Sequence, residues 1–139
     1  PKKVGVSTVD PTKEVLAKIF IDIPKCKYGT SFKRISPREA MSLPVVNVAV
    51  MLTADTSGMI TEARVVASPV DIVPFRAKKT EEFLVGKKPS EEVFEEASKL
   101  AGEEASPRDS LQRGSGAYRK NLVKDLVGQA LREASRTLV

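Results

Sequence analysis

At 139 residues, with 41% hydrophobic and 29% charged residues, the chain has the size and composition of one globular domain with a real core. It contains no histidine and a single cysteine, Cys26. These counts exclude an internal disulfide, Ser-His-Asp and Cys-His catalysis and the usual zinc sites, so neither a catalytic residue nor a metal site is predicted. The net charge of +5 comes from residues 1–40, which hold nine Lys or Arg against four Asp or Glu, whereas residues 41–139 hold fourteen of each.

The first residues predict a tail followed by a strand. Residues 1–13 are polar, contain two prolines and show no periodicity, which is typical of a lead-in tail or linker, and residues 14–139 are expected to form one domain. From Val15 to Ile23, apolar residues occupy every second position. This two-residue period predicts a half-buried strand, which Pro24 ends.

The next part of the chain predicts a hairpin. Residues 28–35 favour a turn and a short strand, and residues 36–41 allow one helical turn because Ser36 precedes Pro37. Residues 45–52 are apolar on both faces apart from Asn47. They predict a central strand that is either covered on both sides or covered on one side and facing a partner on the other.

Residues 54–58 are expected to form a hairpin loop in which Gly58 takes a positive φ, and residues 60–67 return as a strand. Three residues of this strand should point inward: Ala63, Val65 and Ala67. After Pro74 the period changes to that of helices. Helices are predicted from about 75 to 85, ending at Gly86, from an N-cap at Ser90 to about 105, and from about 117 to 137.

Strands that precede helices along the chain favour an α+β fold. We expect an antiparallel meander of three to four strands, with about three helices packed on one face. The alternation of strands and helices that builds nucleotide-binding βαβ units is missing from this pattern.

The turn before the last predicted helix, Arg113-Gly114-Ser115-Gly116, raises the question of a phosphate cradle. The dinucleotide fingerprint requires a third glycine where Arg119 stands, and it must follow a strand, whereas this turn follows a helix. The structural alternative is that Ser115 caps the helix, the glycines turn the chain, and the arginines bind acidic neighbours such as Asp109.

The basic excess near the N-terminus has two interpretations, a solvated face or an anion site. Nucleic acid is not expected as a partner, because only 5% of the residues are aromatic and none alternate with basic residues. A membrane partner is not expected either, since the longest apolar stretch, residues 45–52, is too short to span a bilayer. The lone cysteine favours a reducing compartment, so a cytoplasmic location is expected.

Short motifs follow one another in an order that carries more information than any of them alone. They are Phe32-Lys33-x5-Glu39-Ala40-Met41, Val45-Val46-Asn47-Val48-Ala49-Val50, Ala63-Arg64-Val65-Val66, Pro74-Phe75-Arg76-Ala77, Glu82-Phe83-Leu84-Val85-Gly86, Pro107-Arg108-Asp109 and Arg113-Gly114-Ser115-Gly116-Ala117-Tyr118-Arg119. This order resembles the C-terminal domain of the FAD-binding (medium) subunit of molybdenum hydroxylases, the family of xanthine dehydrogenase, aerobic carbon monoxide dehydrogenase and 4-hydroxybenzoyl-CoA reductase. The resemblance covers roughly residues 12–137. It departs from the family at Gly116, where alanine is usual, and in a loop before Arg113 that is about one residue longer.

The resemblance implies an oxidoreductase in which electrons pass from molybdenum through iron–sulfur clusters to FAD. This domain would close the isoalloxazine pocket, share FAD with a preceding FAD-binding domain, pack against the molybdenum and iron–sulfur subunits, and be inactive alone. It also implies that Lys33, Arg38 and Leu43 lie beside the flavin, with two cations near negative charge and a leucine against the ring. The alternative without a functional role is that Lys33 and Arg38 are surface charges paired with Glu39 or Asp22.

Two other functions stay open at this point. One is a stand-alone protein-interaction module without a redox role, which the nature of the chain upstream of residue 1 would distinguish. The other is a small basic RNA-binding domain, which would show salt-sensitive association with RNA.

Overall fold

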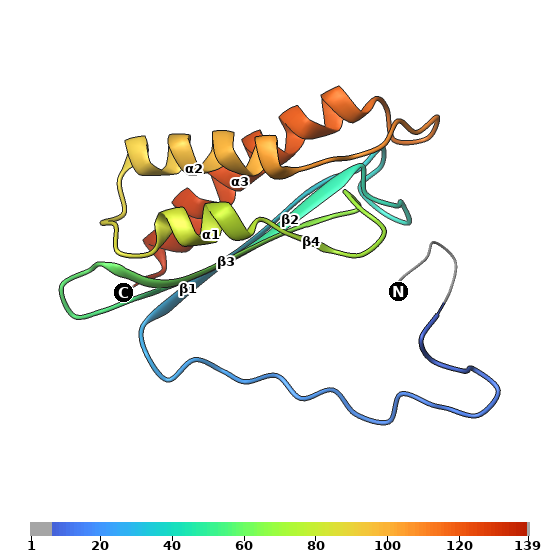
Figure 1. The fold of residues 1–139 in the computed structure, drawn as a ribbon, viewed down its shortest axis with the longest axis horizontal. Helices are drawn as coiled ribbons and strands as arrows, with labels where there is room; N and C mark the ends of the chain where they lie inside the picture. The colour runs from blue at the N-terminus through green and yellow to red at the C-terminus, as the bar shows by residue number, and fades with distance from the viewer. Residues whose placement is uncertain (1–6, 139) are drawn as a thin grey trace.

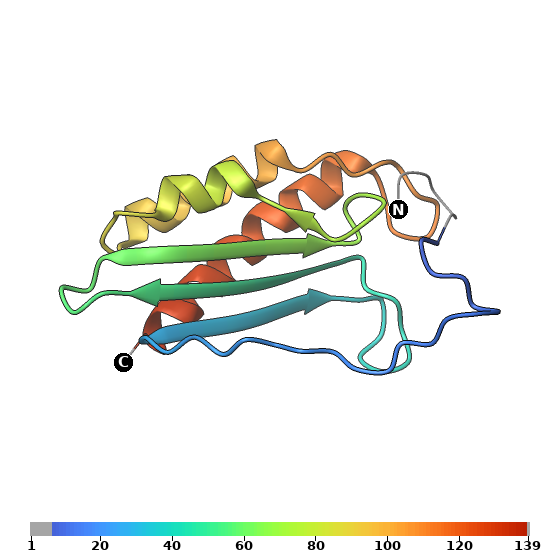
Figure 2. The same cartoon turned by 60° about the horizontal axis from the view of Figure 1, so that its bottom comes forward.

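The computed structural model describes residues 7–138 and arranges them as four strands followed by three helices (Figure 1). The strands form one open antiparallel sheet in the order β1-β2-β3-β4, and the helices cover one of its faces (Figures 1 and 2). The elements are β1 (Tyr28–Ile35), β2 (Val46–Ala54), β3 (Ile60–Ser68), β4 (Phe75–Arg76), α1 (Lys78–Leu84), α2 (Glu91–Glu104) and α3 (Gly116–Arg136). The predicted α+β meander with helices on one face is confirmed.

Strand β2 lies at the centre of the sheet, paired with β1 on one side and β3 on the other. Its alternate residues Val46, Val48 and Leu52 are fully buried against the helices. The opposite face of β2 is not covered by any helix within residues 7–138, and Ala49 on that face is exposed. The central strand is therefore covered on one side only. The inward residues predicted for β3 are confirmed, since Ala63, Val65 and Ala67 are buried.

Helix α3 crosses β1 and β2 and approaches β1 very closely at Gly29 (Figure 2). A Cβ atom added to Gly29 would lie 1.9 Å from the Ala134 carbonyl oxygen. Any larger residue would push the helix away from the strand, so this contact requires glycine. The close approach also explains why residues 28–35 form a full strand: α3 covers the side of β1 on which Gly29 and Ser31 are buried.

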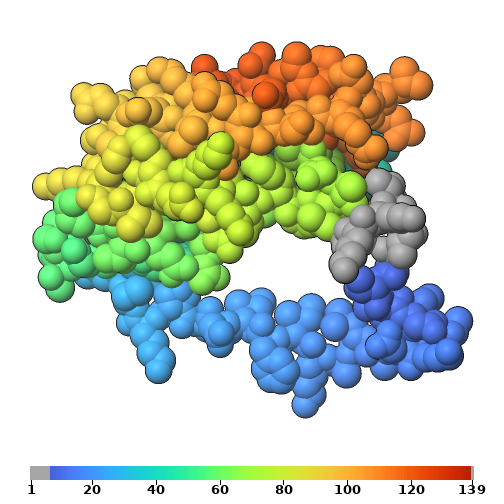
Figure 3. Space-filling view, viewed as in Figure 1, coloured from blue at the N-terminus to red at the C-terminus, as the bar shows by residue number. Residues whose placement is uncertain are grey.

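The strand predicted at residues 15–23 is wrong. These residues are extended but pair with no strand among residues 7–138, and their large apolar side chains are 72–88% exposed. Figure 3 shows this segment, in blue, standing apart from the folded body over much of its length. The period of two reports side-chain alternation correctly, but a strand also needs a neighbour for its N–H and C=O groups, and the described residues supply none.

The helical turn allowed at residues 36–41 is also absent. These residues form bends, and Met41 has a φ of 49°. A positive φ at a non-glycine residue interrupts a right-handed helix. Residues 36–44 instead make an irregular loop between β1 and β2.

The helices follow their predicted signals with one change. The helix expected from 75 begins at Lys78, because residues 75–76 pair with β3 as β4, and the chain turns at Gly86 with a φ of 78°. Ser90 caps α2, its Oγ accepting from the Val93 N–H at 3.3 Å. Ser115 caps α3 in the same way, accepting from the Tyr118 N–H at 3.2 Å.

The division of the chain into a tail, 1–13, and a domain, 14–139, stays a prediction, and residues 1–6 lie outside the described part. Within residues 7–138, no helix has the length and apolarity needed to cross a membrane.

Candidate functional site

The loop of residues 36–44 joins β1 to β2 and is tied down at both ends. The Val45 N–H donates to the Ile35 carbonyl at 2.8 Å, which closes the base of the loop. The Arg34 guanidinium, which extends from β1, donates to the Ser42 carbonyl. These bonds hold an irregular segment in a defined position.

Leu43 and Met41 present apolar side chains to the outside from this loop. Leu43 is 70% exposed and Met41 is 96% exposed, although a loop could have placed polar residues at both positions. Arg38 lies in the same loop and donates to the Met41 carbonyl at 3.2 Å. The loop therefore offers two apolar side chains and one cation on a single short segment.

Lys33 lies elsewhere, on the side of β1 that faces α3. Its Nζ lies 2.6 Å from Glu133 Oε2, and the Ser31 hydroxyl donates to the same oxygen at 2.5 Å. The Lys33 ammonium, and next the Ser31 hydroxyl, lower the pKa of the Glu133 carboxyl. Lys33 thus forms an ion pair, as expected from the alternative without a functional role, but its partner is Glu133 rather than Glu39 or Asp22.

The structure brings two of the three predicted residues together. Arg38 and Leu43 share the 36–44 loop, whereas Lys33 points from the strand toward the helix layer. Contact of any of the three with flavin stays a prediction.

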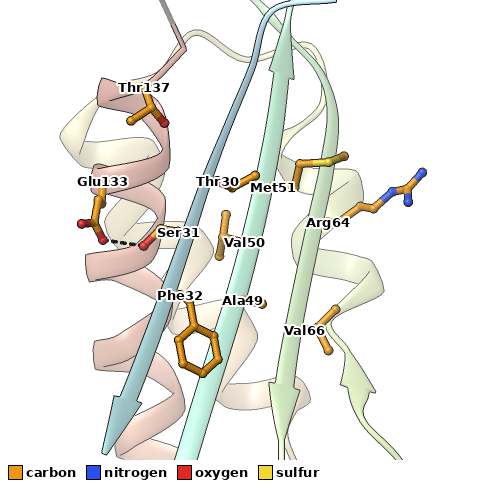
Figure 4. Close-up of a pocket in the computed structure, with 10 residues that line it drawn as sticks. All are labelled: Thr30, Ser31, Phe32, Ala49, Val50, Met51, Arg64, Val66, Glu133 and Thr137. Carbon is orange, nitrogen blue, oxygen red and sulfur yellow. Dashed lines mark hydrogen bonds between the residues drawn. The ribbon is translucent and has the colours of Figure 1, made fainter. Parts of the chain in front are cut away.

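A groove of about 540 Å³ on the sheet was not expected from the sequence (Figure 4). The groove is lined by residues of β1, β2 and β3 and by the C-terminal part of α3, and Phe32, 61% exposed, stands over it. Met51 and Val66 give it further apolar surface. The signal in the sequence was the strand at 45–52 with apolar residues on both faces, one of which lines this groove.

The turn at residues 113–116 confirms the structural alternative in part, since Ser115 caps α3 and Gly114 turns the chain with a φ of 84°. Asp109 Oδ1 accepts from the Gly116 N–H at 2.6 Å, while Arg119 donates to the Arg108 carbonyl at 2.8 Å and to the Pro69 carbonyl. The expectation that Arg119 binds Asp109 is wrong, because its guanidinium bridges two backbone carbonyls instead. A Cβ atom at Gly116 would lie 2.4 Å from the Pro107 oxygen, so the alanine expected from the resemblance does not fit this loop.

No cluster of three or more His, Cys, Asp or Glu side chains able to hold a metal ion lies among the residues that the structure describes.

A family model described as "CO dehydrogenase flavoprotein C-terminal domain" matches residues 31–134. No curated protein matches the sequence. Among solved structures, the chain is similar to reconstituted CO dehydrogenase from Oligotropha carboxidovorans, with a TM-score of 0.74 and 21% identity over 84% of this chain and 40% of that one. It is also similar to a carbon monoxide dehydrogenase from Hydrogenophaga pseudoflava that lacks the Mo-pyranopterin moiety of the molybdenum cofactor, with a TM-score of 0.72 and 22% identity over 80% and 38%.

A third similar structure is quinoline 2-oxidoreductase from Pseudomonas putida 86, with a TM-score of 0.72 and 27% identity over 84% of this chain and 39% of that one. The chain thus spans about two fifths of the length of the solved chains that it matches. The family model's match runs from within β1 to within α3, so it begins after the exposed segment 15–23.

Proposed function

The chain belongs to the family of CO dehydrogenase flavoprotein C-terminal domains, and on this premise we propose that it closes the flavin pocket of a molybdenum-dependent oxidoreductase. In this proposal, FAD is held mainly by a preceding domain, and the chain alone has no complete active site. Molybdenum and iron–sulfur subunits are the proposed partners, and a cytoplasmic location is part of the same proposal. FAD accepts electrons when bound, and the residues described here shape its surroundings.

The observation that supports this function best is the exposed leucine on a clamped loop. Leu43 leaves 70% of its surface uncovered, and the bonds from Arg34 and Val45 hold its loop against the sheet. An apolar side chain presented in this way suits packing against a flat aromatic ring, because burying a leucine contributes about 1.5–3 kcal/mol. Leu43 thus offers an apolar contact that suits the face of a flavin ring.

Arg38 is proposed as the cation beside the flavin. Its guanidinium is anchored to the Met41 carbonyl of its own loop and lies on the same segment as Leu43. A fixed positive charge favours the reduced form of a flavin, which carries more negative charge than the oxidised form. Lys33 is proposed as a positioning residue, since its ammonium binds Glu133 and fastens β1, from which the loop begins, to α3.

Substitution of Leu43 in the complete flavoprotein subunit tests this function. We expect Leu43→Ala to release FAD roughly tenfold faster, because apolar contact with the ring is lost. Val85→Ala is the matched control, since Val85 is also exposed (47%) but lies at the opposite end of the sheet, after α1. FAD release that is equally unchanged in both variants would contradict the proposed contact.

A second test concerns the division of labour between domains. The isolated 139-residue chain should not retain FAD through gel filtration. Stoichiometric flavin in the isolated chain would show that the main binding determinants lie here and would overturn the shared-site proposal.

A third test concerns Arg38. We expect Arg38→Gln in the complete subunit to make the reduction potential of the flavin more negative. Arg136→Gln, at the far end of α3, is the control for the loss of one positive charge.

One observation favours the alternative of a protein-interaction module. The uncovered face of the sheet carries the groove beneath Phe32, and the segment 15–23 exposes further apolar side chains. Both features suit contact with other protein surfaces. In the proposed function they serve packing within the enzyme. If the Phe32→Ser variant assembled into the complete complex as well as the unchanged chain does, this would contradict the use of the groove for packing.

A further inference from the structure

A second cavity, of about 340 Å³, lies between the turn after β3 and the loop before α3. Three arginines line it: Arg108, Arg113 and Arg119. The rest of its wall includes Asp71 and Asp109, so its side chains carry a net charge of one positive unit. This cavity is separate from the groove on the sheet and shares no residue with it.

Arg119 is a buried cation without a carboxylate partner. Its side chain is almost wholly buried, with the residue 5% exposed, and its guanidinium donates only to the carbonyls of Arg108 and Pro69. Its Nε finds no acceptor within residues 7–138. Carbonyl oxygens satisfy hydrogen bonds but carry no full negative charge, so burial of this cation stays costly unless an anion lies nearby.

The surroundings of Arg119 raise that cost. Burial, followed by the positive charges of Arg113 and Arg108, lowers the pKa of Arg119. None of these three arginines forms an ion pair with an acidic side chain in the part of the chain that the structure describes. Three like charges gathered without a partner attract an anion.

The two carboxylates of the wall are engaged elsewhere. Asp109 Oδ1 accepts from the Gly116 N–H at 2.6 Å, and Asp71 Oδ1 accepts from the Ile72 N–H at 2.7 Å. Asp109 thereby occupies the first N–H group of α3, a helix of 21 residues whose positive end faces this loop. Both carboxylates are bound to backbone groups and do not neutralise the arginines through an ion pair.

We propose that this cavity binds a small oxyanion of the phosphate type through the side chains of Arg108 and Arg113, with Arg119 as the buried charge behind them. Guanidinium groups suit this ligand because their planar N–H donors match the oxygens of a phosphate in pairs. The glycine turn itself is not the cradle, since the Gly116 N–H donates to Asp109 and the Gly114 N–H donates to the Ser110 carbonyl. Arginine side chains replace backbone amides as the donors.

Titration of the 139-residue chain with inorganic phosphate tests this site, with sodium chloride at matched ionic strength as the reference. The melting temperature should rise saturably with phosphate at millimolar concentrations and should not rise with chloride. Arg113→Gln should weaken phosphate binding at least fivefold, and Arg113→Lys should fall in between because it keeps the charge and loses the paired donors.

Arg136→Gln is the control, because Arg136 is an exposed arginine at the opposite end of α3. It should bind phosphate like the unchanged chain. Isothermal titration with ADP distinguishes the source of the anion: tighter binding of ADP than of phosphate indicates a nucleotide, and binding of phosphate alone indicates the free ion. Equal stabilisation by chloride and phosphate, or equal binding by Arg113→Gln and Arg136→Gln, would overturn the proposal.

Discussion

Two segments of this chain have closely similar patterns and opposite surroundings. Residues 15–23 and strand β2 both alternate, and both carry apolar side chains on each face. In β2, Val46, Val48 and Leu52 are fully buried, whereas the large apolar side chains of 15–23 are 72–88% exposed. The comparison shows that a period of two specifies how side chains alternate and leaves open which strand lies alongside.

The difference between the segments lies in their neighbours. β2 exchanges backbone hydrogen bonds with β1 on one side and β3 on the other, and helices cover its buried face. The exposed segment has neither kind of contact among residues 7–138. Within residues 7–138, no strand or helix covers its large apolar side chains.

The largest effect should come from a charge placed in each segment. Val48→Asp places an unpaired carboxylate in the core and should lower the free energy of unfolding by more than about 4 kcal/mol, enough to unfold the domain. Phe20→Asp should change it by less than about 0.5 kcal/mol, because Phe20 is 87% exposed. Urea denaturation followed by circular dichroism measures both, and equal destabilisation would show that the exposed segment packs on the domain.

The close approach of α3 to β1 allows a test of how far a neighbouring element stabilises a strand. Gly29→Ala should destabilise the domain by about 3 kcal/mol, because its Cβ would lie 1.9 Å from the Ala134 oxygen. The matched control is Thr30→Ala, at the next position of β1 on the exposed face. Thermal melting of the two variants checks this, and a Gly29→Ala protein as stable as Thr30→Ala would mean that α3 does not rest on β1 at this distance.

A buried polar contact joins α1 to β3 and β4, on the opposite side of the sheet from β1. Glu81 of α1 is buried, accepts from the Val65 N–H at 2.8 Å and binds Arg76 through both oxygens. Glu81→Gln keeps the volume and loses the charge, so it should cost about 2 kcal/mol. Glu82→Gln, at an exposed neighbouring position, should cost nothing measurable by urea denaturation. A result in which both variants match the unchanged chain would remove Glu81 from the contacts that hold β3 to α1.

The smallest effect concerns Glu133 and pH. Lys33, and then Ser31, lower its pKa in the folded chain, so the group stabilises the fold above its unfolded pKa, and this contribution is lost as the pH falls through the lower folded pKa. The Glu133→Gln variant should be less stable than the unchanged chain at pH 7. This difference in the free energy of unfolding should become smaller as the pH falls from 7 to 3. Urea midpoints at each pH measure this difference, with Glu103→Gln as an exposed control that should show no such trend.

The fold was largely predictable because its signals are local. Ser90 and Ser115 mark the starts of α2 and α3 by capping, and the inward residues of β3 follow their alternation. The errors occurred where a distant partner decides. Residues 15–23 lack a neighbouring strand, whereas 28–35 gain one, together with α3, and no local pattern records either fact.

The candidate site was predictable in part. The resemblance selected the stretch that becomes the clamped loop of Arg38 and Leu43, but Lys33 was placed with the wrong acidic partner because Glu133 lies a hundred residues away in the sequence. The groove beneath Phe32 and the arginine cavity were missed, since each combines side chains from segments far apart along the chain. Their geometry depends on tertiary contacts that a single sequence does not display.

The hydrogen bond that closes the base of the 36–44 loop has an evolutionary consequence. Because the Val45 N–H and the Ile35 carbonyl already join the strands below it, the tip can change in sequence or length without disturbing the register of β1 and β2. Mutations in the tip of the loop should therefore change the contacts that the loop makes and have little effect on the stability of the fold. The framework of this domain can therefore stay the same while the outer surface of the loop varies.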